Sequence, residues 1–146
     1  MTLQRLIYCS HPINPSMETV RDILKACERN NPERNLTGML LFTSNCFLQV
    51  LEGGRSAINT QFQIISRDTR HTDIEIIGYR DIDFRSFDQW SMFYVAHTAE
   101  TMRHLSRYSA SATFDPYQMT DTVAEQLCLD FSLRAQQQNP GSAWVA

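Results

Sequence analysis

The sequence predicts an α+β fold with one β-sheet, and three observations support this fold class. Five segments have the composition or the alternation of β-strands, with many β-branched and aromatic residues. Two segments between them carry apolar residues at three- and four-residue spacing, which is the period of an α-helix. A chain of 146 residues fits one domain, and 42% hydrophobic residues can form a sizeable core.

The first strand and the first helix are predicted at the beginning of the chain. Residues 3–9 (LQRLIYC) form the strand, because they are rich in residues that favour sheets. A helix follows after a turn, and Asn14 or Ser16 can cap it. It ends near Asn30, and its apolar stripe consists of Met17, Val20, Ile23, Leu24 and Cys27.

A hairpin, a second helix and two further strands complete the predicted sheet. Residues 36–43 and 47–52 are two strands joined by a short turn, a spacing typical of a hairpin. The apolar positions of residues 55–68 recur with the period of a helix. Residues 74–82 and 90–96 then have the composition of a fourth and a fifth strand.

The order of these elements predicts a ferredoxin-like βαββαβ arrangement with an added fifth strand. Both helices should pack on one face of the sheet, so the C-terminal part must cover the other face. There, residues 105–108 hint at a short helix, and Thr122-x-x-Glu125 can form the capping box of a longer one. We therefore expect three parts of the chain: an α+β domain over 1–97, a helical cap over 98–138 and a frayed tail over 139–146.

Composition and charge argue against several classes of protein. The net charge is −3 and the 13 Lys and Arg are scattered, whereas a nucleic-acid-binding protein needs a clustered basic surface. No apolar run approaches the roughly 18–20 residues of a membrane span, and the first residues lack the pattern of a signal peptide. The four cysteines and four histidines are dispersed, so we expect no metal site. Reduced cysteines suit a cytoplasmic protein.

One polar residue is out of place in an apolar strand. Gln49 shares one face of its strand with Phe47 and Leu51, and the opposite face is apolar too. Gln49 should therefore be buried, and a buried amide without partners costs on the order of 1–3 kcal/mol. In a ferredoxin-like sheet the first strand is next to the second strand of the hairpin, so Tyr8 can be close enough to bond it.

Further polar groups are expected near this pair. Asn30 and Asn31 bring two amides to the end of the first helix, at the crevice between helix and sheet. Ile23 and Ile65 lie on the two helices that flank the crevice. Such a pocket suits a flat molecule whose rings contact the isoleucines and whose polar edge faces the amides.

Five parts of the sequence, in this order and spacing, resemble BLUF domains, the blue-light sensors that hold a flavin. They are Tyr8 and the segments 29–42 (RNNPERNLTGMLLF), 47–53 (FLQVLEG), 68–71 (DTRH) and 87–92 (FDQWSM). The resemblance implies that the α+β domain binds the flavin. The rest of the chain is similar to short stand-alone members, in which two C-terminal helices cover the sheet.

The resemblance implies roles for four residues in light sensing. Tyr8 matches the redox-active tyrosine, and Gln49 matches the glutamine between that tyrosine and the N5 and O4 edge of the flavin. Trp90 and Met92 match the pair on the fifth strand that relays the signal. Which of the two faces the flavin stays open. No residue is expected to be catalytic in the enzymatic sense.

The resemblance also implies the cofactor and its contacts. FAD is the norm of the family, but Ile64 is aliphatic where some relatives have a basic residue that meets the phosphate, so FMN is possible. Asn31 matches the asparagine that fixes O4 and N3, and Asn30 can reach O2. The other matched positions are the isoleucines that sandwich the ring, Ile23 and Ile65, and the signature after the second helix, Asp68, Arg70 and His71.

These residues predict a blue-light photoreceptor without enzymatic output, which signals to a partner protein and forms homo-oligomers. Two alternatives come from other classes. One is a protein-interaction module without a ligand. The other is an acylphosphatase-like hydrolase on the same fold, which would need a glycine-rich anion loop after the first strand. The segment SHPINPS at that place has no glycine.

Overall fold

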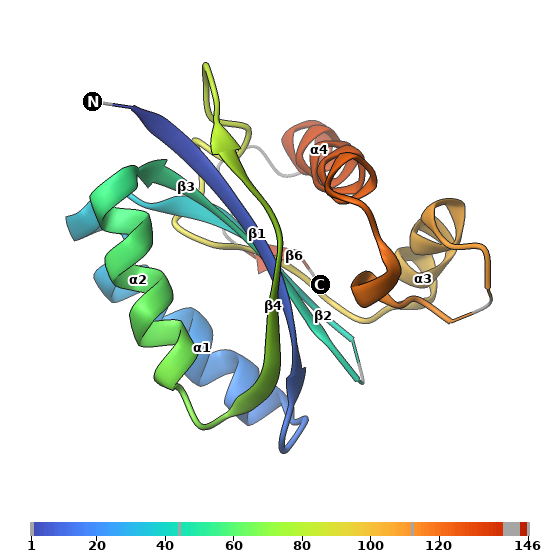
Figure 1. Cartoon of the computed structure of the whole chain (residues 1–146). Coiled ribbons are helices and arrows are strands. Elements are labelled where there is room, and N and C mark those ends of the chain that lie inside the picture. Colours follow the sequence, from blue (N-terminus) through green and yellow to red (C-terminus); the bar gives the residue numbers. More distant parts are fainter. Residues whose placement is uncertain (1, 44, 112, 139–143, 146) are drawn as a thin grey trace.

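The computed structural model describes residues 2–43, 45–111, 113–138 and 144–145, and a six-stranded sheet forms its centre (Figure 1). The order of the strands is β4-β1-β3-β2-β5-β6. Their bounds are Leu3–Pro12 for β1, Thr37–Phe42 for β2, Phe47–Gly54 for β3, His71–Asp81 for β4, Phe93–Val95 for β5 and Trp144–Val145 for β6.

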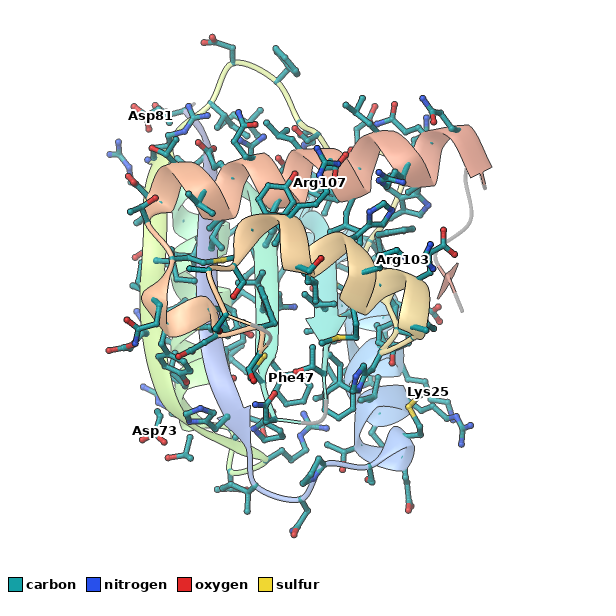
Figure 2. All side chains as sticks on the ribbon, turned by 90° about the vertical axis from the view of Figure 1, so that its right-hand side faces the viewer. Lys25, Phe47, Asp73, Asp81, Arg103 and Arg107 are labelled. Carbon is teal, nitrogen blue, oxygen red and sulfur yellow. The ribbon has the colours of Figure 1, made fainter. Side chains whose placement is uncertain are left out.

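Helices cover both faces of this sheet. Helices α1 (Met17–Asn30) and α2 (Arg55–Arg67) lie side by side on one face, and α3 (Ala99–Leu105) and α4 (Asp121–Gln138) lie on the other (Figure 1). Figure 2 views the second face, where α4 and α3 cross in front of the strands. Three short 3₁₀ helices join the elements, at Pro32–Arg34, Ser106–Tyr108 and Pro116–Gln118. Within the described part of the chain, no helix is long and apolar enough to cross a membrane.

The pairing of the strands confirms the predicted fold class. Strand β1 lies between β3 and β4 and is antiparallel to both, and β2 is antiparallel to β3. The added strand β5 runs parallel to β2. In this register Tyr8 of β1 lies directly opposite Gln49 of β3. The ladder between β1 and β4 shifts its register twice, between Ile7 and Tyr8 and between Cys9 and His11.

Strand β5 is shorter than predicted, because the chain changes its geometry just before it. Residues 90 and 92 would point to the same face in a regular strand. Instead, Trp90 belongs to the apolar cluster under α3 and α4, whereas Met92 belongs to the cluster under α1 and α2. The backbone must therefore turn between these two residues, and regular pairing begins only at Phe93.

The helix ends decide one detail that the sequence analysis left open and correct another. Ser16, and not Asn14, caps α1, since its hydroxyl accepts a hydrogen bond from the N–H of Thr19. Helix α4 begins two residues earlier than the expected capping box, and the Thr120 hydroxyl accepts from the N–H of Val123. The expected Thr122–Glu125 box is wrong, because the Glu125 side chain binds arginines of the sheet instead.

The C-terminal region contains more regular structure than predicted. A full helix, α3, precedes the short helix expected at residues 105–108, and Thr98 caps it. The expected frayed tail lies largely outside the described residues, since 139–143 and 146 are not described. Trp144–Val145, however, forms β6 and pairs in parallel with β5.

The core consists of two layers, one on each face of the sheet. Alternation along β1 sends Leu6 and Tyr8 toward α1 and α2, and Ile7 and Cys9 toward α3 and α4. The strand is therefore buried on both faces, which explains why residues 6–9 (LIYC) form an uninterrupted run without polar alternation.

Gly38 in β2 is required by the close approach of β3. A Cβ atom at this position would lie 1.9 Å from the carbonyl oxygen of Val50. Gly38→Ala is therefore expected to lower the free energy of unfolding by about 3 kcal/mol or more, measured by urea denaturation. Gly78→Ala is the matched control, because its Cβ would meet Asp121 alone, at 3.2 Å from Cβ and 3.9 Å from Cα. It should cost about 1 kcal/mol or less, and equal losses in both variants would contradict this explanation.

Candidate functional site

A cavity lies between α1 and α2, above strands β1 and β3. Its walls come from both helices, and its floor comes from the two central strands. The sequence analysis named most of its polar and apolar lining. Of the predicted residues, those that line the cavity are Tyr8, Ile23, Asn30, Gln49, Ile65, Asp68, Arg70 and His71.

The floor of the cavity contains a buried hydrogen bond between a phenol and an amide. The hydroxyl of Tyr8 donates to Oε1 of Gln49, and both side chains are only 4% exposed. Burial raises the pKa of Tyr8 well above its usual value, so the phenol stays protonated and acts as the donor at neutral pH. The predicted partnership is therefore present in the structure, and it satisfies one end of the buried amide.

The other end of the Gln49 amide points to a sulfur atom. Its Nε2 donates to Sδ of Met92 at 3.5 Å. A thioether is a weak acceptor and has no donor. The amide orientation is therefore defined at both ends: oxygen toward Tyr8 and nitrogen toward Met92.

Trp90 lies on the other side of the sheet. It is 1% exposed and packs against Phe93 and Phe87, with ring centroids 4.9 and 6.5 Å apart. Its Nε1 has no hydrogen-bond partner among the described residues. The sequence left open whether Trp90 or Met92 faces the cavity side of the sheet. In the structure, Met92 is the residue beside Gln49.

Only one of the two polar side-chain atoms of Asn31 is hydrogen-bonded to another described residue. Its Nδ2 donates to the carbonyl oxygen of Ser91 at 2.8 Å, but its Oδ1 is buried without a hydrogen-bond partner in the described part of the chain. An unpaired buried acceptor costs free energy, so a donor from a bound molecule would stabilise this site. Asn30 lines the cavity and Asn31 does not, although both stand at the end of α1. The amide set fits the polar edge of a flavin, which carries one N–H and two carbonyl oxygens.

Asp68 and Arg70 form an ion pair at the rim of the cavity. The Arg70 guanidinium donates to both carboxylate oxygens, at 2.6–3.0 Å. The hydrogen bonds from Arg70 hold the pKa of Asp68 below its usual value. Because Asp68 accepts the guanidinium edge-on, it fixes the orientation of a positive charge at the rim.

His71 has a structural role that the sequence did not predict. Its Nε2 lies 2.7 Å from the carbonyl oxygen of Ile65, so this nitrogen must be the donor. Its Nδ1 lies 2.7 Å from the Ser10 hydroxyl and can accept from it. His71 thus joins the end of α2 to β1, although its ring also lies beside Tyr8, with centroids 6.4 Å apart.

Sequence reasoning missed Gln61 and Arg34 in the cavity wall. Arg34 donates from Nη1 to Oε1 of Gln61, and both line the cavity together with Cys27 and Phe47. The position of Gln61, one helical turn before Ile65, could have revealed it. Arg34 matters because it adds a second positive charge near the cavity, where Ile64 offers none.

The depressed pKa of Asp68 predicts how acid affects the stability. A carboxyl with a lowered folded-state pKa stabilises the fold above its unfolded pKa, near 3.8, and loses this contribution as the pH falls through the folded value. Asp68→Asn should therefore cost up to about 1 kcal/mol near pH 7. The cost should shrink as the pH is lowered from about 7 to an acidic value below the folded-state pKa, measured by urea denaturation at both pH values. Arg70→Gln should cause the same loss, and the double variant no further loss; an equal cost at both pH values would contradict the ion pair as its cause.

Comparison with known proteins identifies the family of the chain. Residues 3–93 match the family model described as sensors of blue-light using FAD. Photoactivated adenylate cyclase subunit beta of Euglena longa is 31% identical over 133 residues, which are 90% of this chain but 14% of that protein. The blue light- and temperature-regulated antirepressor BluF of Escherichia coli strain K12 is 32% identical over 73 residues, 49% of this chain and 18% of that protein.

Two solved structures resemble the whole arrangement. The photo-activated state of BlsA superposes with a TM-score of 0.82 and 26% identity, covering 90% of this chain and 95% of that one. The dark state of BlrB, a BLUF protein, has a TM-score of 0.68 and 30% identity, covering 86% and 97%. The chain therefore belongs to the BLUF family, the sensors of blue-light using FAD.

Proposed function

We propose that this chain is a blue-light photoreceptor whose switch is the Gln49 amide. The observation that carries the proposal is the buried Tyr8–Gln49 hydrogen bond on the floor of an accessible cavity. Asn30 and Asn31 are suited to hold the polar edge of a flavin, and Ile23 and Ile65 to contact its two faces. The rim residues Asp68, Arg70 and His71 complete the proposed cofactor-binding set.

Tyr8 and Gln49 supply the groups for electron and proton transfer. Blue light absorbed by a bound flavin would create a strong oxidant within reach of the Tyr8 phenol. A phenol that has given up an electron becomes a strong acid, and its proton can pass along the existing hydrogen bond to Oε1 of Gln49. When the electron and proton return, the amide can be left rotated or as a tautomer, with no net oxidation or reduction.

Rotation of the Gln49 amide would break its hydrogen bond to Met92. In the present orientation Nε2 donates to the methionine sulfur. After rotation an amide oxygen would face a sulfur that has no proton to donate. Met92 is flexible enough to move away from this contact. The proposed signal thus leaves the pocket at the start of β5.

We infer FAD as the cofactor, with FMN as the alternative. The family is described as using FAD. Arg34 and Arg70 bring positive charge to the cavity wall and rim and could compensate the phosphate charge, although Ile64 is 45% exposed and aliphatic. Release of the cofactor by heat and its separation by chromatography would distinguish FAD from FMN.

The output of the sensor is proposed to be a protein partner. The relatives named above include cyclase subunits and an antirepressor, and this chain spans 14–18% of their length. We propose that residues 1–97 sense light and that residues 98–138 form the helical cap that meets the partner, in a cytoplasmic homo-oligomer. Comparison of the proteins captured by dark and illuminated chain would test this output.

Colour is the direct test of the flavin. The purified chain should be yellow, and blue light should shift its absorption reversibly to longer wavelength, measured by difference spectroscopy. A correctly folded chain that stays colourless after incubation with FAD or FMN would contradict the proposal. The ligand-free interaction module would then be favoured.

The switch itself is tested by removing the amide. Gln49→Leu should retain the flavin but abolish the light-induced red shift, because leucine can neither accept from Tyr8 nor change its hydrogen bonding. Gln61→Leu makes the same change in a residue that lines the cavity but bonds Arg34 instead of Tyr8. It should keep the shift. A normal shift in Gln49→Leu would show that another group is the switch.

A further inference from the structure

A network of buried charges lies on the face of the sheet opposite the cavity. Arg5 of β1 is 5% exposed, and Glu52 of β3 is fully buried. Arg5 donates from Nε to Oε2 of Glu52 at 2.9 Å, from Nη1 to Oε1 of Glu125 in α4 at 2.6 Å and from Nη2 to the Ser86 hydroxyl at 2.8 Å. One guanidinium therefore connects the sheet, α4 and the loop after β4.

Glu52 also holds the beginning of the segment that leads to β5. Its carboxylate accepts hydrogen bonds from the backbone N–H groups of Ser86 and Phe87, at 2.9 and 2.8 Å. The carbonyl oxygen of Ser86 accepts in turn from the Ser132 hydroxyl and from Nε2 of Gln136, both on α4. This end of the segment is thus bonded to the sheet and to the helix at once.

The other end of the same segment is bonded to the cavity side. The carbonyl oxygen of Ser91 accepts from Asn31, and Met92 accepts from Gln49. Residues 86–92 therefore pass from the face covered by α4 to the face that contains the cavity.

The buried charges make the α4 end of this segment hard to release. Removing one partner of a buried ion pair costs far more than the pair contributes, because the other charge is left without compensation. Glu125 also accepts from Arg80, at 2.9 and 3.0 Å. Burial raises the pKa of Glu125, but the hydrogen bonds from Arg80 and Arg5 outweigh this and lower it, so the carboxylate is charged at neutral pH. When Met92 is displaced, residues 86–92 should therefore move as a unit, because breaking their hydrogen bonds to Glu52 would cost more free energy.

We infer that Glu52 is a positioning residue that connects the light switch to α4. Its connection to the helix runs through Arg5, which also binds Glu125 of α4. Glu52 holds residues 86–92 in place, so that a change at Gln49 and Met92 moves the segment and the helix together. The inference rests on the proposed function and adds to it the residues through which the signal leaves the sheet.

The test changes the contact on α4 and leaves the buried Arg5–Glu52 pair intact. Glu125→Gln keeps the size and polarity of the side chain but removes its charge. Asp130→Asn is the matched control, because it makes the same change on the same helix, where the carboxylate meets Arg107 and Arg134 instead. Hydrogen exchange of the α4 amides is measured in the dark and under blue light on the full flavin-loaded chain, together with the absorption spectrum.

Glu125→Gln should keep the red shift but reduce the light-induced change of exchange in α4 by at least about twofold. Wild type and Asp130→Asn should show the full change. A merely structural contact would alter exchange in the dark and leave the light-minus-dark difference unchanged. Should Glu125→Gln fail to fold, Ser132→Ala, which removes the bond to the Ser86 carbonyl, should reduce the difference in the same way.

Three results would overturn the inference: an α4 in the wild type that does not respond to light, a full response in Glu125→Gln or Ser132→Ala, and an equal loss in Asp130→Asn. Failure of the proposed function is recognised separately, because the wild-type chain would then show no reversible red shift at all.

Discussion

The hydrogen bond between Tyr8 and Gln49 is the constraint on which the rest of the structure depends. Both side chains are buried on the central strands, so each needs the other to satisfy its polar atoms. The register of β1 against β3 places them opposite each other. A slip of one residue would turn Gln49 to the face of α4 and leave Tyr8 unpaired. The sheet and the site are thus specified by the same contact.

The sequence was sufficient for the fold and for the centre of the site, for identifiable reasons. Strict alternation placed Gln49 inside, and the topology of the strands placed Tyr8 next to it. The choice between Trp90 and Met92 was out of reach, because the backbone turns between them and alternation no longer applies. The cap of α4 was misplaced at Thr122, because its Glu125 has tertiary partners that local pattern cannot reveal.

Alternation along the strands also predicts the burial of the charged pair Arg5 and Glu52, which the sequence analysis does not name. Both stand in apolar strands at positions that alternation assigns to the α4 face. The same reasoning that marked Gln49 as out of place applied to them as well. Their burial gives the two faces of the sheet different tasks. One face surrounds the cavity with amides and apolar walls, and the other connects strands, loop and helix through charge.

The two register shifts in the β1–β4 ladder affect how copies of this chain can associate. Strand β4 ends the order of the described strands, so one side of its backbone is not paired with another of them. Irregular strands with charged side chains are poor templates for another strand, and β4 carries both features, including Asp73 with a left-handed φ of 55°. Edge-to-edge pairing of β4 with a strand of another copy is therefore disfavoured.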